Sequence, residues 1–156
     1  MNKLDVIAPV AESPLHKPTP HDSAPKHVAG TAEYIDDIVE PVGTVHAYLG
    51  LSERAHAKIL DMDLDAVRQA PGVIGVLTEA DIPGVNDVSP SHQHDEPVFA
   101  PGYVQFFGQP MFAVIAETRD AARRAARLAR VVYEDLPAAL DVDAARASGG
   151  KLVTSP

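Results

Sequence analysis

The densest group of residues able to do chemistry is the segment His92-Gln93-His94-Asp95-Glu96. Alternate side chains of an extended backbone point to the same side, so His92 and His94 are predicted to face the same way and could share a metal ion. A zinc site needs three or four converging ligands, and no third ligand follows at a recognisable spacing. A solvated polar loop is the alternative interpretation, and we assign no metal-binding residue.

Three alternating aspartates, Asp61, Asp63 and Asp65, resemble the start of a calcium-binding loop. The pattern then fails, because Ala66 stands where the sharp turn needs glycine and no glutamate closes the loop at the required spacing. Polarity at the edge of a strand, followed by Asp65 as the N-cap of a short helix, explains all three carboxylates.

Other polar pairs have structural interpretations that outweigh catalytic ones. The adjacent Asp36 and Asp37 are conceivable for acid–base chemistry, but bonds to the backbone that shape a turn are favoured. Arg54 and His56 flank a predicted hairpin turn, where they pair with a carboxylate or lie on the surface. Gln109 follows a glycine between two strands, which favours a buried structural hydrogen bond over a contact with a ligand.

Several classes of site are excluded by what the sequence lacks. The chain has no cysteine, which removes disulfides, thiolate nucleophiles, Cys-ligated zinc and iron–sulfur clusters. It contains no glycine-rich nucleotide-binding motif, and the segment 50–54 fails the serine-hydrolase pattern. We therefore assign no catalytic, cofactor-binding or metal-binding residue.

The charge and the apolar pattern limit the partners and the location. A net charge of −9 repels phosphate backbones and anionic lipids, so nucleic acid and membrane surfaces are not expected as partners. The start of the sequence lacks a signal-peptide pattern, and the longest apolar run, Met111 to Ala116, is too short to span a bilayer. We expect a cytoplasmic protein.

The chain divides into three parts by composition. Residues 1–26 carry five prolines and are predicted to form an extended lead, residues 27–147 a folded domain, and residues 148–156 a tail. Residues 80–97, rich in Pro, Gly, Asn, Asp, Ser and His, are predicted to form a long loop that meets a partner or ligand. Apolar runs predict strands at 44–52, 58–64, 73–78, 103–107, 111–117 and 131–133.

One helix stands out, at residues 118–130, with its helical body at about 119–130. Thr118 is suited to cap it, and a stripe of alanines predicts that it lies close against a sheet, while its arginines form a solvated face or an anion site. Shorter helices are expected at 66–70 and 141–147. Helices and strands do not alternate regularly, which predicts an α+β fold, a mixed sheet with this main helix packed on it.

The order of segments resembles the α/β hammerhead domain that opens the large, molybdopterin-binding subunit of molybdenum hydroxylases. Coverage runs from about residue 20 to 145, and PHDSA (20–24), GLSERAHA (50–57) and NDVSP (86–90) are most similar to the bacterial xanthine dehydrogenase branch. Single motifs are weak, but the ordered set is specific. The segments that carry it are HVAGTAEYIDDI (27–38), GTVHAYLGLSERAHAKI (43–59), APGVIGVLTEADIPGVNDVSP (70–90), HDEPVFA (94–100), FFGQPMFAVIAET (106–118) and ARLARVVYEDLPAALDVDAA (126–145).

The resemblance implies a structural, non-catalytic domain of an enzyme that hydroxylates hypoxanthine or xanthine. In that family molybdenum is held by molybdopterin beyond the hammerhead, and electrons pass through 2Fe-2S clusters and FAD to NAD. No residue of this chain matches a family catalytic position, so the fragment is expected to hold no cofactor and to be inactive alone. The tail at 148–156 is expected to lead to the missing molybdopterin-binding region. Expected partners are the remainder of the large subunit and an iron–sulfur/FAD subunit, with a homo-oligomer possible.

Three alternatives stay open. The chain could be a stand-alone hammerhead that serves as a binding or interaction module. It could be the same domain from an aldehyde oxidase or carbon monoxide dehydrogenase type of hydroxylase. It could also be a metal-binding protein that uses His92 and His94. We further hypothesise that the loop at 81–97 and the proline-rich lead contact the cofactor domains.

Overall fold

The computed structural model describes residues 15, 17–90 and 94–149. The chain forms two compact units, Met1–Glu40 and Pro41–Pro156. The described part contains no helix long and apolar enough to cross a membrane.

In the described part of the first unit there are two short helical turns, α1 (Ala24–Ala29) and the 3-10 turn η1 (Ile35–Asp37). Pro25 lies in the first turn of α1, where a missing N–H costs nothing, and Gly30 ends the helix in the left-handed conformation with φ 68°. The expected extended lead at 1–26 is thus wrong for its last three residues, which begin this helix. The predicted domain boundary after residue 26 stays a prediction.

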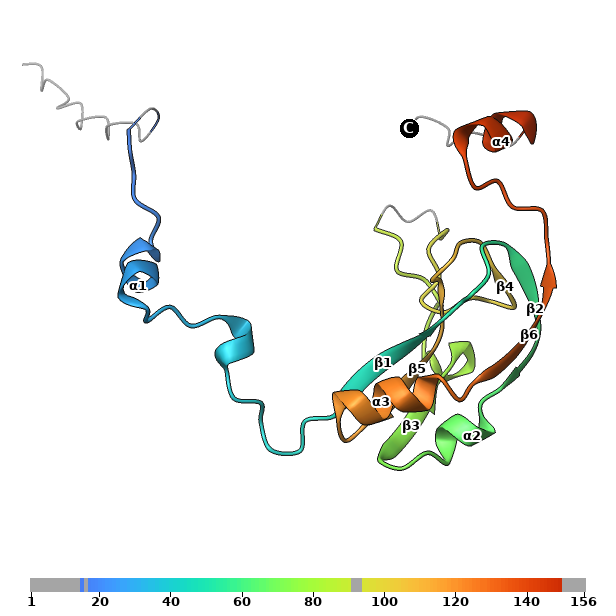
Figure 1. Cartoon of the computed structure of the whole chain (residues 1–156), viewed down its shortest axis with the longest axis horizontal. Coiled ribbons are helices and arrows are strands. Elements are labelled where there is room, and N and C mark those ends of the chain that lie inside the picture. The colour runs from blue at the N-terminus through green and yellow to red at the C-terminus, as the bar shows by residue number, and fades with distance from the viewer. Residues whose placement is uncertain (1–14, 16, 91–93, 150–156) are drawn as a thin grey trace, which may run out of the picture. The chain divides into compact units, whose positions relative to one another are not determined.

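A three-stranded sheet forms the centre of the second unit (Figure 1). Its strands are β1 (His46–Leu51), β5 (Pro110–Ala116) and β3 (Val73–Leu77), in the order β1-β5-β3 with both pairings antiparallel. We call it the β5 sheet. The continuous apolar run predicted as a central strand is indeed central, because β5 pairs on both sides.

A second three-stranded sheet has the order β4-β2-β6, again antiparallel throughout. It consists of β2 (Ala57–Asp63), β4 (Tyr103–Val104) and β6 (Arg130–Asp135), and we call it the β2 sheet. The α+β class is confirmed, but the single mixed sheet is replaced by two antiparallel sheets. The hairpin turn around Arg54 and His56 is also wrong, since β1 and β2 pair with different partners and residues 52–56 carry the chain from one sheet to the other.

The described residues of this unit also form three α-helices and a 3-10 turn: α2 (Asp65–Arg68), η2 (Glu79–Asp81), α3 (Arg119–Ala126) and α4 (Val142–Ala147). The Thr118 hydroxyl accepts a hydrogen bond from the Ala121 amide at 3.1 Å, which confirms the predicted cap of α3. The helix stops at Ala126 rather than near residue 130, because β6 begins at Arg130 in register with Asp63.

The core lies between α3 and the β5 sheet and extends toward the β2 sheet. Phe112, Val114 and Ala116 on alternate positions of β5 pack with the buried Ala122 and Ala125 of α3. This confirms that the alanine stripe brings the helix close to the sheet. Gly50 of β1 pairs with Phe112, and a Cβ at Gly50 would lie 2.1 Å from the ring's Cζ atom. The aromatic ring therefore occupies the space that the glycine leaves open.

Candidate functional site

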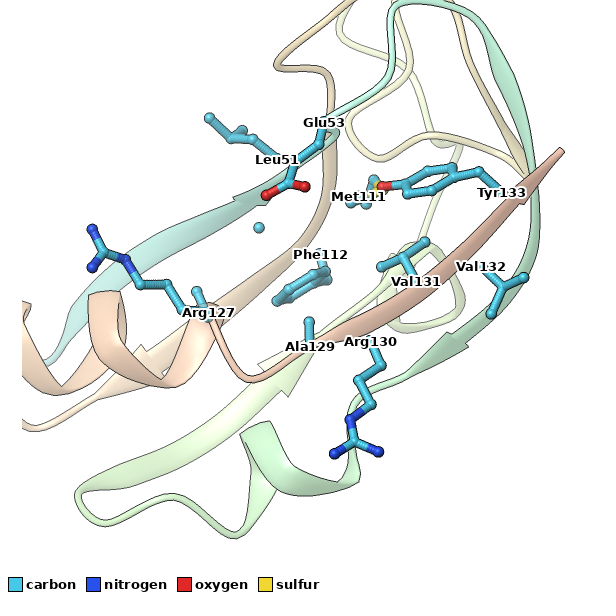
Figure 2. Close-up of a pocket in the computed structure, with 12 residues that line it drawn as sticks. Leu51, Glu53, Met111, Phe112, Arg127, Ala129, Arg130, Val131, Val132 and Tyr133 are labelled. Carbon is cyan, nitrogen blue, oxygen red and sulfur yellow. The ribbon is translucent and has the colours of Figure 1, made fainter. Parts of the chain in front are cut away.

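A pocket of about 410 Å³ opens between the β5 sheet and β6 of the β2 sheet. Figure 2 shows the Phe112 ring in its floor, with Val131 and Ala129 beside it. The Tyr133 hydroxyl donates a hydrogen bond to the Met111 sulfur at 3.3 Å. The floor is thus apolar, and its one polar side-chain contact is satisfied within the protein.

Charged side chains stand only at the rim of this pocket. In Figure 2 the Glu53 carboxylate points inward above Phe112, whereas the guanidinium groups of Arg127 and Arg130 extend away from the centre. One carboxylate above an apolar floor provides neither a nucleophile next to a base nor a set of hydrogen-bond donors for an anion. The apolar floor is suited to holding an apolar group.

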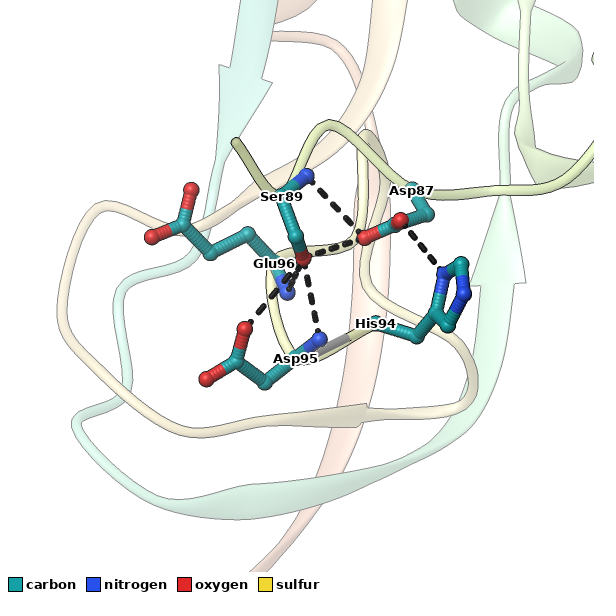
Figure 3. A network of polar contacts seen from close by, with 5 residues as sticks. All are labelled: Asp87, Ser89, His94, Asp95 and Glu96. Atoms are coloured by element: carbon teal, nitrogen blue, oxygen red, sulfur yellow. Dashed lines mark hydrogen bonds and ion pairs between the residues drawn. The ribbon is translucent and has the colours of Figure 1, made fainter. Parts of the chain in front are cut away.

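The loop expected at 80–97 is shaped around the Ser89 hydroxyl (Figure 3). This buried oxygen accepts hydrogen bonds from the backbone amides of Asp95 at 3.0 Å and Glu96 at 2.9 Å, and donates to the Asp87 carboxylate. His94 Nδ1 lies 2.7 Å from the other Asp87 oxygen. We call these five residues the Ser89 clasp.

A serine, an aspartate and a histidine thus meet, but not in the order that activates a nucleophile. A catalytic triad places histidine between serine and the carboxylate, whereas here Asp87 separates Ser89 from His94. The Ser89 oxygen is also occupied by two amide donors. The hydrogen bond from the Ser89 hydroxyl is the main cause that lowers the pKa of the Asp87 carboxyl, against the opposing effect of burial. The clasp therefore holds the loop in shape.

Asn86 closes the same loop a second time. Its side-chain amide donates to the Phe99 carbonyl at 2.8 Å and accepts from the Phe99 amide at 3.0 Å. These two bonds span 13 positions of the sequence, so no local pattern could have revealed them. The polar NDVS segment predicts a turn, but not the partner across the loop.

The metal site on His92 and His94 stays a hypothesis. His92 lies outside the described residues, and His94 Nδ1 is engaged with Asp87. Within the described ranges no three His, Cys, Asp or Glu side chains are grouped so that they could hold a metal ion.

Two carboxylates of the candidate calcium loop and turn, those of Asp63 and Asp37, accept hydrogen bonds from the backbone. Asp63 Oδ1 accepts from the Asp65 amide at 2.9 Å, so Asp63 stabilises the start of α2, and Asp65 is its first residue and not its cap. Asp37 accepts from the Tyr34 amide at 2.9 Å, which confirms the turn-shaping role expected of that residue. Asp36 lies in the same 3-10 turn, η1.

Arg54 and His56 tie the connection between the two sheets to the end of β6. Arg54 Nε lies 3.1 Å from the Asp135 carboxylate, and its guanidinium lies 5.4 Å from the centre of the Tyr133 ring. His56 Nδ1 lies 2.6 Å from the Pro137 carbonyl oxygen. Arg54 therefore makes the pairing with a carboxylate that the sequence analysis gave as one of two alternatives.

The remaining candidates are structural as well. Gln109 is buried, and its side-chain oxygen accepts from the Gln105 amide at 2.7 Å, as expected. Arg123 and Arg124 of α3 both pair with Asp120 one turn earlier. The hydrogen bond from Arg124, followed by that from Arg123, lowers the pKa of the Asp120 carboxyl. These arginines thus form a surface ion-pair cluster and not an anion site.

Comparisons with known proteins give one consistent result. The family model described as "Aldehyde oxidase and xanthine dehydrogenase, a/b hammerhead domain" matches residues 29–137. Xanthine dehydrogenase of Oryza sativa subsp. japonica is 42% identical over 133 residues, which are 85% of this chain and 10% of that protein. Nicotinate hydroxylase hnxS of Emericella nidulans is 40% identical over 137 residues, 88% of this chain and 10% of that protein.

Solved structures share the fold. Aldehyde oxidoreductase from Desulfovibrio gigas superposes with a TM-score of 0.73 at 29% identity, over 81% of this chain and 15% of that one. The carbon monoxide dehydrogenase from Oligotropha carboxidovorans gives a TM-score of 0.63 at 30% identity, over 79% and 15% of the two chains. The chain thus spans about a tenth of the length of the curated relatives it matches.

Proposed function

Because the chain belongs to the aldehyde oxidase and xanthine dehydrogenase hammerhead family, we propose that it is a non-catalytic scaffold within a larger molybdenum hydroxylase. The match over residues 29–137 carries this proposal. The geometry supports it, since the polar clusters around Ser89, Gln109 and Asp63 bind the chain's own backbone.

The parent reaction is the hydroxylation of hypoxanthine or xanthine, with electrons passing through 2Fe-2S clusters and FAD to NAD. Xanthine dehydrogenases from several organisms among the relatives, at 37–42% identity, support this choice of substrate. Two alternatives remain. The nicotinate hydroxylase at 40% identity favours a different heterocycle as the substrate, and the similarity to the carbon monoxide dehydrogenase favours a different branch of the family.

The residues that the structure describes do not fit the molybdopterin cofactor of that reaction. Molybdopterin carries a phosphate, and the guanidinium groups of Arg127 and Arg130 at the pocket between the two sheets extend away from its apolar floor, so neither is directed inward to hold an anion. No described group of three His, Cys, Asp or Glu side chains is placed to bind a metal. The cofactor is therefore assigned to polypeptide other than this chain.

The scaffold's partners are the molybdopterin-binding remainder of its own subunit and an iron–sulfur/FAD subunit. The two described sides of the loop that contains the Ser89 clasp, residues 86–90 and 94–97, are bonded to each other through Ser89, so they present a preformed surface to such a partner with little entropic cost. We propose that this loop and the proline-rich lead are the segments that contact the cofactor domains. A homo-oligomer and a cytoplasmic location complete the proposal.

Purified protein of this sequence tests the proposal. Circular dichroism should show a folded α+β protein, while xanthine oxidation and bound molybdenum should both be at background. Turnover of xanthine, or stoichiometric molybdenum with pterin fluorescence, would overturn it. The same elemental analysis, on protein made without a histidine tag, tests the His92/His94 hypothesis.

The stand-alone module is tested by the coding sequence. A reading frame that continues past residue 156 into a molybdopterin-binding region supports the scaffold, whereas a stop codon there supports an independent interaction module.

A further inference from the structure

A second pocket, of about 320 Å³, lies between the loop that carries the Ser89 clasp and the segment that joins β4 to β5. Its polar lining comes from Asp95 and Glu96 of the loop and from Gln105 and Gln109 of the segment. We call it the Gln109 pocket. Its volume is in the range of small-molecule sites, and it combines apolar walls with a few polar groups, as such sites do.

Hydrogen bonds hold both walls of the Gln109 pocket in place. In the loop wall the Glu96 amide donates to the Ser89 hydroxyl oxygen at 2.9 Å. In the other wall the Gln105 amide donates to Gln109 Oε1 at 2.7 Å, and the Gln109 amide donates to the Phe106 carbonyl at 3.2 Å. The described walls are therefore formed before a ligand arrives, which lowers the entropic cost of binding.

The Gln109 side chain brings one unused hydrogen-bond donor to this pocket. The residue is 2% exposed, and the bond from the Gln105 amide to Oε1 leaves the two N–H groups of Nε2 for other partners. No residue that the structure describes accepts a hydrogen bond from Nε2. No described side-chain nitrogen is both fully buried and without a partner, so Nε2 reaches the surface of the pocket that Gln109 lines. This donor is suited to a carbonyl oxygen of a ligand.

Two carboxylates decide which charge the ligand can carry. Asp95 and Glu96 are both exposed, and in Figure 3 their carboxylates lie on the opposite side of the clasp from the His94 ring. Carboxylates accept hydrogen bonds from N–H groups and repel anions. The pocket is therefore suited to an uncharged group that presents an N–H as well as a carbonyl.

Phe106 adds an aromatic surface to the lining of the pocket. Its side chain is 53% exposed, so part of the ring is open to a ligand. Aromatic rings stack in offset or edge-to-face arrangements, which favours a planar ring over a flexible chain as the ligand. A planar ring that carries a carbonyl and an N–H is a lactam.

We propose that the Gln109 pocket binds a small uncharged lactam. The carbonyl oxygen of the lactam accepts from Gln109 Nε2, its N–H donates to the carboxylate of Asp95 or Glu96, and its ring lies against Phe106. This ligand site is additional to the proposed scaffold function and does not depend on it.

Titration of the 156-residue protein with three small rings tests the inference. The lactam is 2-pyridone, whereas 2-methoxypyridine lacks the N–H and nicotinate carries a carboxylate. Nuclear magnetic resonance follows the side-chain NH₂ group of Gln109 in each titration. The shift should saturate with 2-pyridone, and 2-pyridone should bind at least about tenfold more tightly than either of the others, because one loses a hydrogen bond and the other is repelled.

Variants locate the site. Gln109→Glu keeps an acceptor for the Gln105 amide but removes the donor, so it should abolish binding of 2-pyridone. Phe106→Leu, at a half-exposed position, should retain the fold and weaken binding about threefold to tenfold. The matched control is Phe107→Leu, because Phe107 is 72% exposed and lines a different pocket, so binding should be unchanged. If Gln109→Glu does not fold, the comparison of the two phenylalanine variants decides.

Three results overturn the inference without touching the proposed function: no saturable shift of the Gln109 NH₂ group with 2-pyridone, equal binding of all three rings, or equal effects of Phe106→Leu and Phe107→Leu. A saturable shift that is selective for 2-pyridone and is weakened by Phe106→Leu alone supports it. The scaffold function is tested separately, by the molybdenum content and the turnover of xanthine.

Discussion

Replacing Gly50 with alanine adds a single methyl group at the most tightly packed of the glycines that the structure describes. The new Cβ would lie 2.1, 2.2 and 2.5 Å from the Cζ, Cε1 and Cε2 atoms of Phe112, whereas ordinary contacts begin near 3.4 Å. The buried ring must therefore move by more than 1 Å, away from its place between β1 and α3.

The magnitude follows from two opposing contributions. Overpacking a core costs about 1–3 kcal/mol. In a strand, alanine stabilises the fold by roughly 0.5–1 kcal/mol relative to glycine, because alanine leaves the unfolded chain with less conformational entropy to lose on folding. We expect a net loss of about 1–2 kcal/mol, and at about 4 °C per kcal/mol a decrease in melting temperature of roughly 4–8 °C.

The assay is thermal and urea unfolding followed by circular dichroism, with Gly75→Ala as the matched control. Gly75 also lies in a strand of the same sheet, but a Cβ there meets nothing within 4 Å, so alanine should be neutral or slightly stabilising. Phe112→Leu combined with Gly50→Ala should be less destabilising than the sum of the two single changes, since shortening the ring side chain removes the clash. Equal melting temperatures for Gly50→Ala and Gly75→Ala would refute the argument.

Three further outcomes are expected. Thr118→Ala should cost about 1 kcal/mol in unfolding free energy because the Ala121 amide loses its cap, while Thr118→Ser should retain it; equal losses would contradict this cause. Ser89→Ala should cost about 1–3 kcal/mol and speed hydrogen exchange at the Asp95 and Glu96 amides, whereas unchanged exchange would show that the clasp does not hold the loop. The pKa of the Asp87 carboxyl is lowered in the folded state, so the ionised carboxylate stabilises the fold above its ordinary pKa of 3.8, and this stabilisation is lost as pH falls through the folded-state pKa. Asp87→Asn should therefore make the free energy of urea unfolding less sensitive to pH between about 5 and 2. An unaltered pH profile would contradict this role of Asp87.

Much of the secondary structure is predictable because it depends on neighbours in the sequence. The apolar run at 111–117, the Thr118 cap and the alanine stripe each indicate an element by local period alone, and β5 and α3 confirm them. The residues at which these elements end are harder to predict from neighbours in the sequence. The alanine pattern continues to residue 129, yet α3 stops at Ala126 because β6 must start in register with β2.

The candidate site shows the same division. The turn-shaping role of Asp37 and the buried amide of Gln109 could be predicted, since their partners lie three and four residues away. The pairing of Arg54 with Asp135 and of Asn86 with Phe99 could not, because the partner could have been any of many distant groups.

The order of the amino acids is enough to establish an α+β domain of the hammerhead type, rich in small aliphatic residues, with no cysteine chemistry and a strongly acidic character. Three features became visible only in the folded chain: the strands divide into two antiparallel sheets, Phe112 fills the space over Gly50, and Leu49 and Leu77 of the β5 sheet remain half exposed. The physical reason is that periodicity reports which side of an element is apolar, whereas pairing and coverage depend on contacts between residues far apart in the chain.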